Sequence, residues 1–417
     1  MNQANTYDII NAGPRHRFTA NGKIVSNCGR MFQPQNLPRP SVSHEDILLG
    51  IEAIKGGFVH YADYFDVMKL ASSALRYAIC AETGKKLVIS DLSNIEGRVL
   101  AWLAGEEWKL EAFRMFDKKL GPDIYVAAYA KTFRVPQSEV DDKKRQVGKV
   151  QELAFGFAGA VGAFVAFAPA GKIDLSKFPA AVLPTVPDDI RAEAEKFYDW
   201  RVDQDVKKAK DKAAKDATGA TKWKEVYEAK GTYGLEREVY ITIECVKRLW
   251  RRDHPAICEF WKLAENACRS ASMVSKRKFH FGKCYAIKSG NWVKVVLPGG
   301  HVLCYPDMQV DSENRLWYWG MDQYTKKWSK IFTTGGKITE NCTQACARDV
   351  FKYGQLEAEK RGYSVVLVVH DELVCEVPDN DTYTVKELES IMATVPDWAE
   401  GLPLAAKGHA SYRYHKD

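Results

Sequence analysis

The sequence lacks the cysteine patterns that mark zinc sites and disulfide frameworks. Its ten cysteines are scattered over 417 residues without a CxxC pair. Cys342 and Cys346 lie four residues apart, but no second pair of ligands completes a tetrahedral zinc site. This cysteine usage is typical of reduced thiols in a cytosolic protein.

A secretory signal is also missing. Residues 1–8 are polar, whereas a signal peptide needs an apolar segment after a basic start. The uncharged run 153–171 is about as long as a membrane span, but its four glycines and Pro169 make a transmembrane helix the weaker interpretation. We therefore expect a cytoplasmic protein with no membrane partner.

Charge of one sign does not dominate the chain. Its 60 lysines and arginines against 54 acids leave a net charge of +6, which permits a nucleic-acid partner without requiring one. Seven of the lysines fall within residues 207–224. A solvated helical face explains this run, and an arm that contacts phosphates is the alternative.

Hydrophobic periodicity predicts helical and β-rich parts. Residues 43–76 and 94–104 show the spacing of amphipathic helices, and a mostly helical region continues to about Ser275. Residues 278–334 contain short β-like runs separated by turn residues, and a helix is expected over 340–361. These patterns predict an α+β fold with a large helical insertion.

Two aspartates end apolar strands. Asp91 follows the run 87–89, and Asp371 lies in the turn between the aliphatic runs 364–369 and 373–377. Carboxylates beside a core are costly unless they are paired or bind a metal. Nucleotidyl transfer uses two divalent ions about 3.5–4 Å apart, bridged by carboxylates. Considered singly, each aspartate would be an ordinary turn or cap residue.

One stripe of side chains recurs every four residues, at Arg145, Lys149, Leu153 and Phe157. On a helix these residues share one face, with two cations at one end and two apolar groups at the other. The cations suit a triphosphate, and the apolar groups suit a base and sugar. Alone, the stripe would describe an ordinary amphipathic helix.

Three segments, in order, resemble the motifs of family A (DNA polymerase I-like) DNA polymerases. DLSNIEGRVLAWLAGE (91–106) is similar to motif A, RQVGKVQELAFGF (145–157) to motif B and VVHDELVCEV (368–377) to motif C. QPQNLP (33–38) and ENCTQACARD (340–349) resemble segments that grip the primer–template. The resemblance implies a palm of antiparallel sheet and helices, a mostly helical fingers insertion, and extension of a DNA primer with dNTPs.

The resemblance also assigns a metal site. It implies that Asp91 and Asp371, with the backbone carbonyl of Leu92, hold two Mg²⁺ ions, or Mn²⁺ in their place. Glu372 would lie beside the metals as a further catalytic residue. His370 would lie near the primer terminus or the nucleotide phosphates.

For the incoming nucleotide, the resemblance names residues of motifs A and B. Arg145 and Lys149 would bind the triphosphate, and Lys149 would act as a general acid toward pyrophosphate. Leu153 and Phe157 would contact the sugar and base. Glu96 corresponds to the steric gate, where a ribose 2′-hydroxyl would fall.

Contacts with the primer–template would come from Gln35, Asn36, Gln344 and His370. The two glutamines would read minor-groove acceptors, which every correct base pair presents, and so would test geometry rather than sequence.

Motif B departs from the family at two positions. Leu153 stands where many members have an aromatic residue, which affects sugar discrimination. Phe157 stands where tyrosine is usual, and that tyrosine hydroxyl helps to hold the steric-gate glutamate. Glu96 therefore needs another donor or is held more loosely. Neither departure removes a metal ligand.

The start of the chain matches a different family. TYDIINAGPRHRFTANGKIVSNC (6–28) resembles the C-terminal end of an intein. Cys28 would be the thiol that receives the upstream segment, and Asn27 would cyclise to a succinimide. Asp8 and His16 would assist proton transfer. The matching fragment would lie on a separate polypeptide that carries the N-terminal polymerase half; an N-terminal tail ending in a chance Asn-Cys pair is the alternative.

Together the resemblances predict four segments: a short β-type intein fragment (1–27), a first palm part (28–105), fingers (106–330) and a second palm part (331–417). Several segments also resemble bacteriophage sequences, so the expected location is the cytoplasm of a bacterium or of a phage-infected host.

Two other functions remain open. A catalytically inactive DNA-binding accessory would share the fold, but Asp91, Lys149 and Asp371 are intact. A single-subunit RNA polymerase would share palm and fingers, but Glu96 would block the 2′-hydroxyl that such an enzyme accepts.

Overall fold

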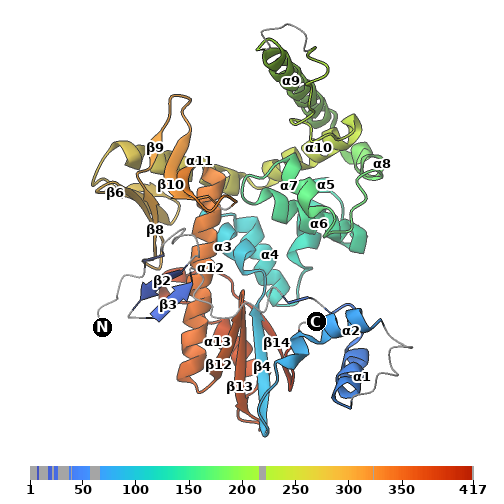
Figure 1. The fold of residues 1–417 in the computed structure, drawn as a ribbon, viewed down its shortest axis with the longest axis vertical. Helices are drawn as coiled ribbons and strands as arrows, with labels where there is room; N and C mark the ends of the chain where they lie inside the picture. Colours follow the sequence, from blue (N-terminus) through green and yellow to red (C-terminus); the bar gives the residue numbers. More distant parts are fainter. Residues whose placement is uncertain are drawn as a thin grey trace.

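The computed structural model describes residues 37–38, 40–56, 66–215, 222–322 and 324–415. Before them it describes only the backbone of three strands, β1 (Tyr7–Asp8), β2 (Arg17–Ala20) and β3 (Lys23–Ser26). Figure 1 shows a sheet with flanking helices at the bottom, a second group of strands at the upper left, and a group of helices at the upper right.

The lower sheet has four antiparallel strands in the order β12-β13-β4-β14. Their bounds are Lys85–Leu92 (β4), Ser364–Val369 (β12), Glu372–Pro378 (β13) and Ala406–Ser411 (β14). The run 87–89 predicts the central strand β4, and the two runs around Asp371 predict β12 and β13, so these predictions are confirmed. The predicted α+β class fits this sheet and the helices around it.

Side chains of β4 alternate between two apolar layers, as the pleat requires. Val88 belongs to the main core, together with residues of α12 (Gly335–Lys360) and α13 (Val385–Met392). Leu87 and Ile89 belong to a smaller core that also contains Tyr414 from the end of the chain. The central strand is therefore covered on both faces.

The described residues before Asp123 contain four α-helices: α1 (His44–Lys55), α2 (Val67–Ala74), α3 (Ile95–Ala104) and α4 (Glu107–Asp117). The described residues of the run 43–76 thus contain two α-helices, α1 and α2. Each begins at a capping side chain, because Ser43 accepts from the Asp46 N–H and Asp66 accepts from the Lys69 N–H.

The upper-right group contains α5 (Ile124–Phe133), α6 (Asp142–Phe155), α7 (Val161–Phe167), α8 (Phe178–Val182), α9 (Asp188–Ala213) and α10 (Arg237–Asp253). These helices share a second hydrophobic core. The uncharged run 153–171 is divided, since α6 ends inside it and α7 begins inside it. Among the described residues, no helix is long and apolar enough to cross a membrane.

The upper-left group follows α11 (Pro255–Met273). It contains β5 (Phe279–Phe281), β6 (Cys284–Ser289), β7 (Trp292–Val296), β8 (Val302–Pro306), β9 (Gln309–Val310), β10 (Leu316–Met321) and β11 (Trp328–Thr333). The β-like pattern of 278–334 is therefore confirmed. Strands β5 to β8, with β1, form one sheet, and β9 to β11 form another.

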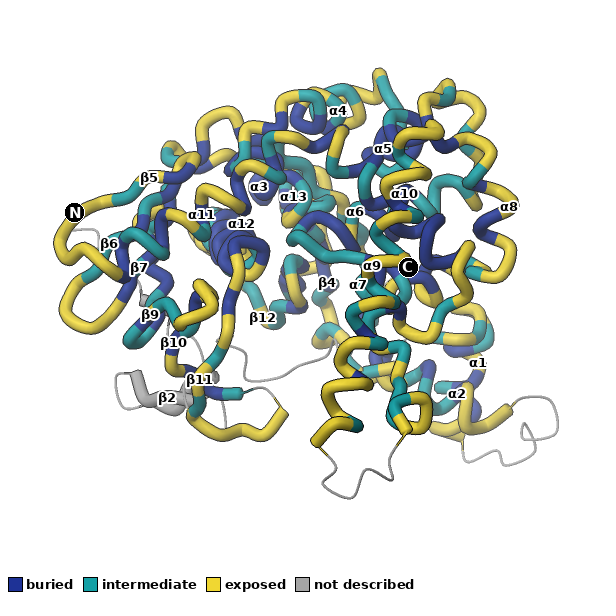
Figure 2. The backbone as a smooth tube through the Cα atoms, turned by 90° about the horizontal axis from the view of Figure 1, so that it is seen from above, coloured by how far each residue is buried: buried dark blue, intermediate teal, exposed yellow. Residues whose placement is uncertain are grey.

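These strands pack into the main core with α12 and the lower sheet. Figure 2 shows the burial of the chain from above: residues along α12, α3 and α10 are buried, and exposed segments lie around the periphery. The helix predicted over 340–361 begins earlier, at Gly335, because Thr334 caps it and accepts from the Lys337 N–H. Short 3-10 turns complete the fold at Arg76–Ala78, Gln137–Glu139, Leu183–Thr185 and Asp397–Ala399.

Candidate active site

The lower sheet brings the two predicted metal-binding aspartates together. In the antiparallel register of β4 and β13, Asp91 lies opposite Glu372. The Leu92 N–H donates to the backbone carbonyl of Asp371 over 3.1 Å. Asp91 and Asp371 therefore lie at the same end of adjacent strands, although they are far apart in the sequence.

The turn that carries Asp371 has two residues. Val369 pairs with Glu372 across the hairpin, which leaves His370 and Asp371 between the strands. His370 adopts a left-handed backbone conformation with φ of +57°. Histidine tolerates this conformation better than most residues, but a non-glycine residue still pays on the order of 1–3 kcal/mol for it. Ten other described non-glycine residues also have a positive φ, so this conformation by itself indicates only the tight turn.

Glu372 is held by a residue that the sequence did not indicate. Its side chain is buried, and the Tyr414 hydroxyl donates to its Oε1 over 2.7 Å. Burial, followed by the bond to Glu372, raises the pKa of Tyr414 above its usual range. A lone tyrosine near the end of the chain gives no pattern in the sequence, since only tertiary folding brings it to β13.

Two carboxylates and a backbone carbonyl fit the metal that the resemblance implies. Mg²⁺ prefers oxygen ligands and is commonly held by one or two carboxylates plus substrate phosphates and water. Asp91, Asp371 and the Leu92 carbonyl belong to neighbouring positions at one end of the sheet. Within the described part of the chain there is no group of three or more His, Cys, Asp or Glu side chains arranged to hold a metal by themselves.

Glu96 lies in the first turn of α3, directly after the strand that ends with Asp91 and Leu92. Desolvation, followed by the negative charge of Glu340 on α12, raises its pKa. No hydrogen bond to its carboxylate is found among the residues that the structure describes. Gln344, a predicted primer–template contact, is exposed on α12.

Helix α6 carries three of the four residues of the predicted stripe. Arg145, Lys149 and Leu153 lie on it, but the helix ends at Phe155, so the prediction that Phe157 continues the same helical face is wrong. A Cβ on Gly159 would lie 1.8 Å from the carbonyl oxygen of Ala154. The chain can therefore turn tightly back on the helix end, and Phe157 lies in that turn.

The two cations of the predicted stripe on α6 differ in their surroundings. Arg145 Nε donates to Asp123 Oδ2 over 2.5 Å, and its guanidinium lies 5.4 Å from the centre of the Tyr125 ring. Lys149 forms no ion pair with any described residue. Leu153 is 45% exposed. Lys149 and Leu153 are therefore available to a ligand, whereas the charge of Arg145 is already partly neutralised by Asp123.

The inner face of α6 is fixed by buried polar groups that the sequence did not indicate. Glu152 forms an ion pair with Lys109 of α4, and it accepts from Trp250 Nε1 over 2.7 Å. His254 Nε2 lies 3.2 Å from the same carboxylate. Burial opposes ionisation of Glu152, but Lys109 and His254 outweigh it and hold its pKa far below the usual range. These contacts join α6 to α4 and α10.

Two predicted DNA contacts, Gln35 and Asn36, lie outside the described residues. The end of the same segment is described, and Arg76 holds it: its Nε donates to the Pro38 carbonyl over 3.1 Å, and its terminal nitrogen donates to the Leu37 carbonyl over 2.9 Å. The predicted splicing residues His16, Asn27 and Cys28 also lie outside the described residues. Asp8 is described only as backbone of β1, which pairs in parallel with β8.

Comparison with known proteins finds a relative that matches most of the chain. Over 399 residues, or 93% of this chain, the sequence is 31% identical to the DNA polymerase of Bacillus phage SP02. The chain is similar to DNA polymerases. A stretch of 90 residues is 37% identical to part of the DNA polymerase I of Chloroflexus aurantiacus, covering 22% of this chain and 9% of that protein. This polymerase-like chain spans 50% of the length of the phage polymerase.

Comparisons with protein-family models and with solved structures add little to this similarity. No protein-family model matches the chain. Among solved structures, the POL domain of Pol1 from M. smegmatis in complex with DNA primer-template and dNTP aligns with a TM-score of 0.44 and 14% identity, over 82% of this chain and 42% of that one. That likeness is too distant to inform function.

Proposed function

We propose that the chain is the catalytic C-terminal half of a family A DNA polymerase that adds dNTPs to a primer 3′ end in DNA replication or repair. The observation that carries this proposal is the position of Asp91 and Asp371 at one end of the lower sheet. The similarity to a phage DNA polymerase over 93% of the chain supports it. In this proposal residues 28–105 and 331–417 supply the palm, and 106–330 supply the fingers.

Asp91, Asp371 and the Leu92 carbonyl hold two Mg²⁺ ions, or Mn²⁺ in their place. When bound, these ions neutralise phosphate charge and favour the ionised primer hydroxyl. Glu372 stays beside the site, oriented by Tyr414. His370 contacts the primer terminus or the phosphates from the strained turn.

The triphosphate lies along α6. Lys149 contacts it and donates a proton to the departing pyrophosphate, while Arg145 contributes a cation that Asp123 partly balances. Leu153 and Phe157 contact the sugar and base. Glu96 excludes a ribose 2′-hydroxyl by occupying its place. Gln344, Gln35 and Asn36 contact the primer–template.

Primer extension with magnesium, comparing dNTPs with ribonucleotides, tests this proposal and its two alternatives. A polymerase of this type extends with dNTPs and discriminates against ribonucleotides at Glu96. An inactive accessory protein binds the primer–template without extending it. An RNA polymerase prefers ribonucleotides, and either of these last two results would overturn the proposal.

Leu153→Phe is expected to change the selectivity for sugar-modified nucleotides by about fivefold, equivalent to about 1 kcal/mol of differential contact. The side chain is 45% exposed, so the larger ring does not overfill a core, and stability should change by no more than about 0.5 kcal/mol. Steady-state kinetics with deoxy- and dideoxynucleotides measure the ratio. Leu356→Phe on α12, at a leucine of similar exposure, is the matched control. Unchanged selectivity with lowered stability would make Leu153 a structural residue.

We also propose that the chain matures by protein splicing in trans. The residues that support this step are Asn27, Cys28, Asp8 and His16, which match the C-terminal end of an intein. The Asn27 side chain attacks its own backbone carbonyl, which breaks the bond to Cys28 and forms a succinimide, after the Cys28 thiol has received the upstream segment. The partner is a separate N-terminal polymerase half with the N-terminal intein fragment.

For splicing, the isolated chain is expected to remain uncut at 47.0 kDa, because residues 1–27 are too few to build the folded site that cyclisation needs. Mixed with its partner, it should lose a small peptide and form a ligated product with Cys28 at the junction. Asn27→Ala should block peptide release, and Cys28→Ala should block ligation. Mass spectrometry distinguishes these products. An active enzyme that retains residues 1–27 would show that the segment is an ordinary tail.

A further inference from the structure

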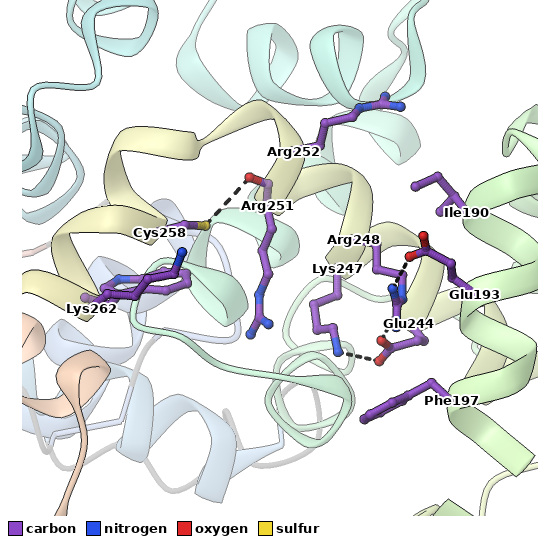
Figure 3. Close-up of a pocket in the computed structure, with 11 residues that line it drawn as sticks. Ile190, Glu193, Phe197, Glu244, Lys247, Arg248, Arg251, Arg252, Cys258 and Lys262 are labelled. Carbon is purple, nitrogen blue, oxygen red and sulfur yellow. Dashed lines mark hydrogen bonds and ion pairs between the residues drawn. The ribbon is translucent and has the colours of Figure 1, made fainter. Parts of the chain in front are cut away.

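A cavity of about 630 Å³ lies between α9 and the pair α10–α11, and none of its lining residues belongs to the site described above. Five cationic and two acidic side chains line it. Figure 3 shows Arg251 extending into it between Lys262 on one side and Lys247 on the other. Its volume falls within the range of about 300–1,000 Å³ that is usual for ligand pockets.

Two of the cations are neutralised within the protein. Lys247 pairs with Glu244 over 2.5 Å, and Arg248 Nε pairs with the same carboxylate over 3.0 Å. Arg248 also pairs with Glu193. Because Glu193 belongs to α9 and the other three residues to α10, these contacts fasten α9 to α10 and build one wall of the cavity. Phe197 adds an apolar surface beside Lys247.

The other three cations have weaker carboxylate contacts or none. Arg251 has no carboxylate partner in the described part of the chain. The nearest carboxylate to Arg252 is 3.8 Å away and belongs to Asp253, which pairs more closely with Arg134. Lys262 is 70% exposed and pairs with Glu259 of its own helix over 3.4 Å, an exposed contact that stabilises little. The cavity therefore keeps positive charge that an anionic ligand can use.

The cavity adjoins the C-terminal end of α6. Arg251 donates to the backbone carbonyl of Gly159 over 3.1 Å, in the turn between α6 and α7. Trp261, which also lines the cavity, donates from Nε1 to the carbonyl of Gly156 over 3.0 Å. In the proposed function the triphosphate lies at Lys149, and the base lies toward this end of the helix. The template base that pairs with it must therefore approach from beyond the helix end, where the cavity is.

We propose that this cavity binds the phosphate backbone of the single-stranded template as it approaches the primer terminus. The inference rests on the proposed polymerase function. Arginine and lysine contacts to phosphates position a strand without reading its sequence, as a template-directed enzyme requires. Arg251, which has no carboxylate partner in the described part of the chain, and the weakly paired Arg252 and Lys262 supply these contacts. The ion pairs of α9 keep the wall in place.

The test uses the full chain with the double variant Arg252→Glu and Lys262→Glu. Both side chains are solvent-accessible and neither holds the fold together. Lys55→Glu with Lys360→Glu is the control, because it makes the same change in net charge at two exposed lysines on α1 and α12. The ligands are fluorescent primer–templates with one unpaired template nucleotide or with a single strand of about 12 nucleotides, a length typical of single-strand sites.

Binding is measured by anisotropy at several salt concentrations, without divalent metal or nucleotide. For the long overhang, we expect the double variant to lose at least tenfold in affinity and its salt slope to fall by about 1.4, from two lost phosphate contacts. Binding to the short overhang should stay within twofold, and the control variant should bind both ligands like the unchanged chain.

Equal binding of the long overhang by the double variant and the unchanged chain would overturn the proposal. An equal loss for both overhangs would overturn it as well, because it would reveal only a general electrostatic effect. The measurement does not depend on catalysis. A chain that shows the expected binding pattern but fails to extend a primer would contradict the proposed polymerase activity. The same result would still support the single-strand binding site.

Discussion

Replacing Asp91 or Asp371 with Ala is expected to reduce primer extension at least about a thousandfold, while primer–template affinity stays within about twofold. Each carboxylate supplies charge to the metals, and metal stabilisation of the reacting phosphate contributes several kcal/mol to catalysis. Binding of the primer–template depends mainly on phosphate contacts elsewhere. Single-turnover extension with magnesium measures the first quantity, and anisotropy without metal measures the second.

Asp379→Ala provides the matched control. Asp379 follows the opposite end of β13, where its carboxylate lies 3.8 Å from Lys86 Nζ, so the substitution removes an acid from the same sheet without touching the site. We expect this variant to extend primers at a normal rate. Circular dichroism of all three variants should match the unchanged chain. Turnover near the unchanged rate for either Asp91→Ala or Asp371→Ala would refute the two-metal assignment.

Replacing Lys149 with Ala is expected to lower kcat/KM for dNTPs by about 10- to 150-fold and to leave primer–template affinity unchanged. A hydrogen bond to a charged group contributes about 1.5–3 kcal/mol, and Lys149 has no ion pair within the described residues that could compensate. Lys144→Ala on the same helix is the control, because its Nζ already donates to the Glu139 carbonyl over 2.7 Å.

Lys149→Arg separates binding from proton transfer. Arginine keeps the positive charge on the triphosphate but does not release a proton in the accessible pH range. We therefore expect it to restore KM and leave kcat low. Recovery of both constants would show that Lys149 only binds the triphosphate. Unchanged kinetics of Lys149→Ala would show that α6 is an ordinary amphipathic helix without a role in nucleotide binding.

Local sequence patterns predicted the elements that carry Asp91 and Asp371, the aspartates proposed to be catalytic. The apolar run before Asp91 and the two largely aliphatic runs around Asp371 are short and rich in β-branched residues, so they predict buried strands. The turn at His370 and Asp371 follows from those bounds. Bringing the two aspartates together required the family resemblance, because no local pattern pairs β4 with β13.

The parts that sequence analysis missed depend on tertiary contacts. The position of Tyr414 against Glu372 and the contacts of Lys109 and His254 with Glu152 join segments that are distant in the chain. The end of α6 before Phe157 was missed for another reason. The four-residue spacing continues past the helix end, while the glycines that allow the turn interrupt the helix without changing that spacing.

The order of strands in the lower sheet also governs how the site forms during synthesis. One of its inner strands, β4, is completed at Leu92, but its neighbours β13 (Glu372–Pro378) and β14 (Ala406–Ser411) begin at least 280 residues later (372 − 92). At about 5–20 residues per second, the ribosome takes roughly 15–60 s to reach the first of them. Until then β4 has two unpaired edges and an apolar sequence, so the nascent chain needs protection from aggregation. A chain that stops before the turn between β12 and β13 also lacks Asp371, one of the two proposed metal ligands.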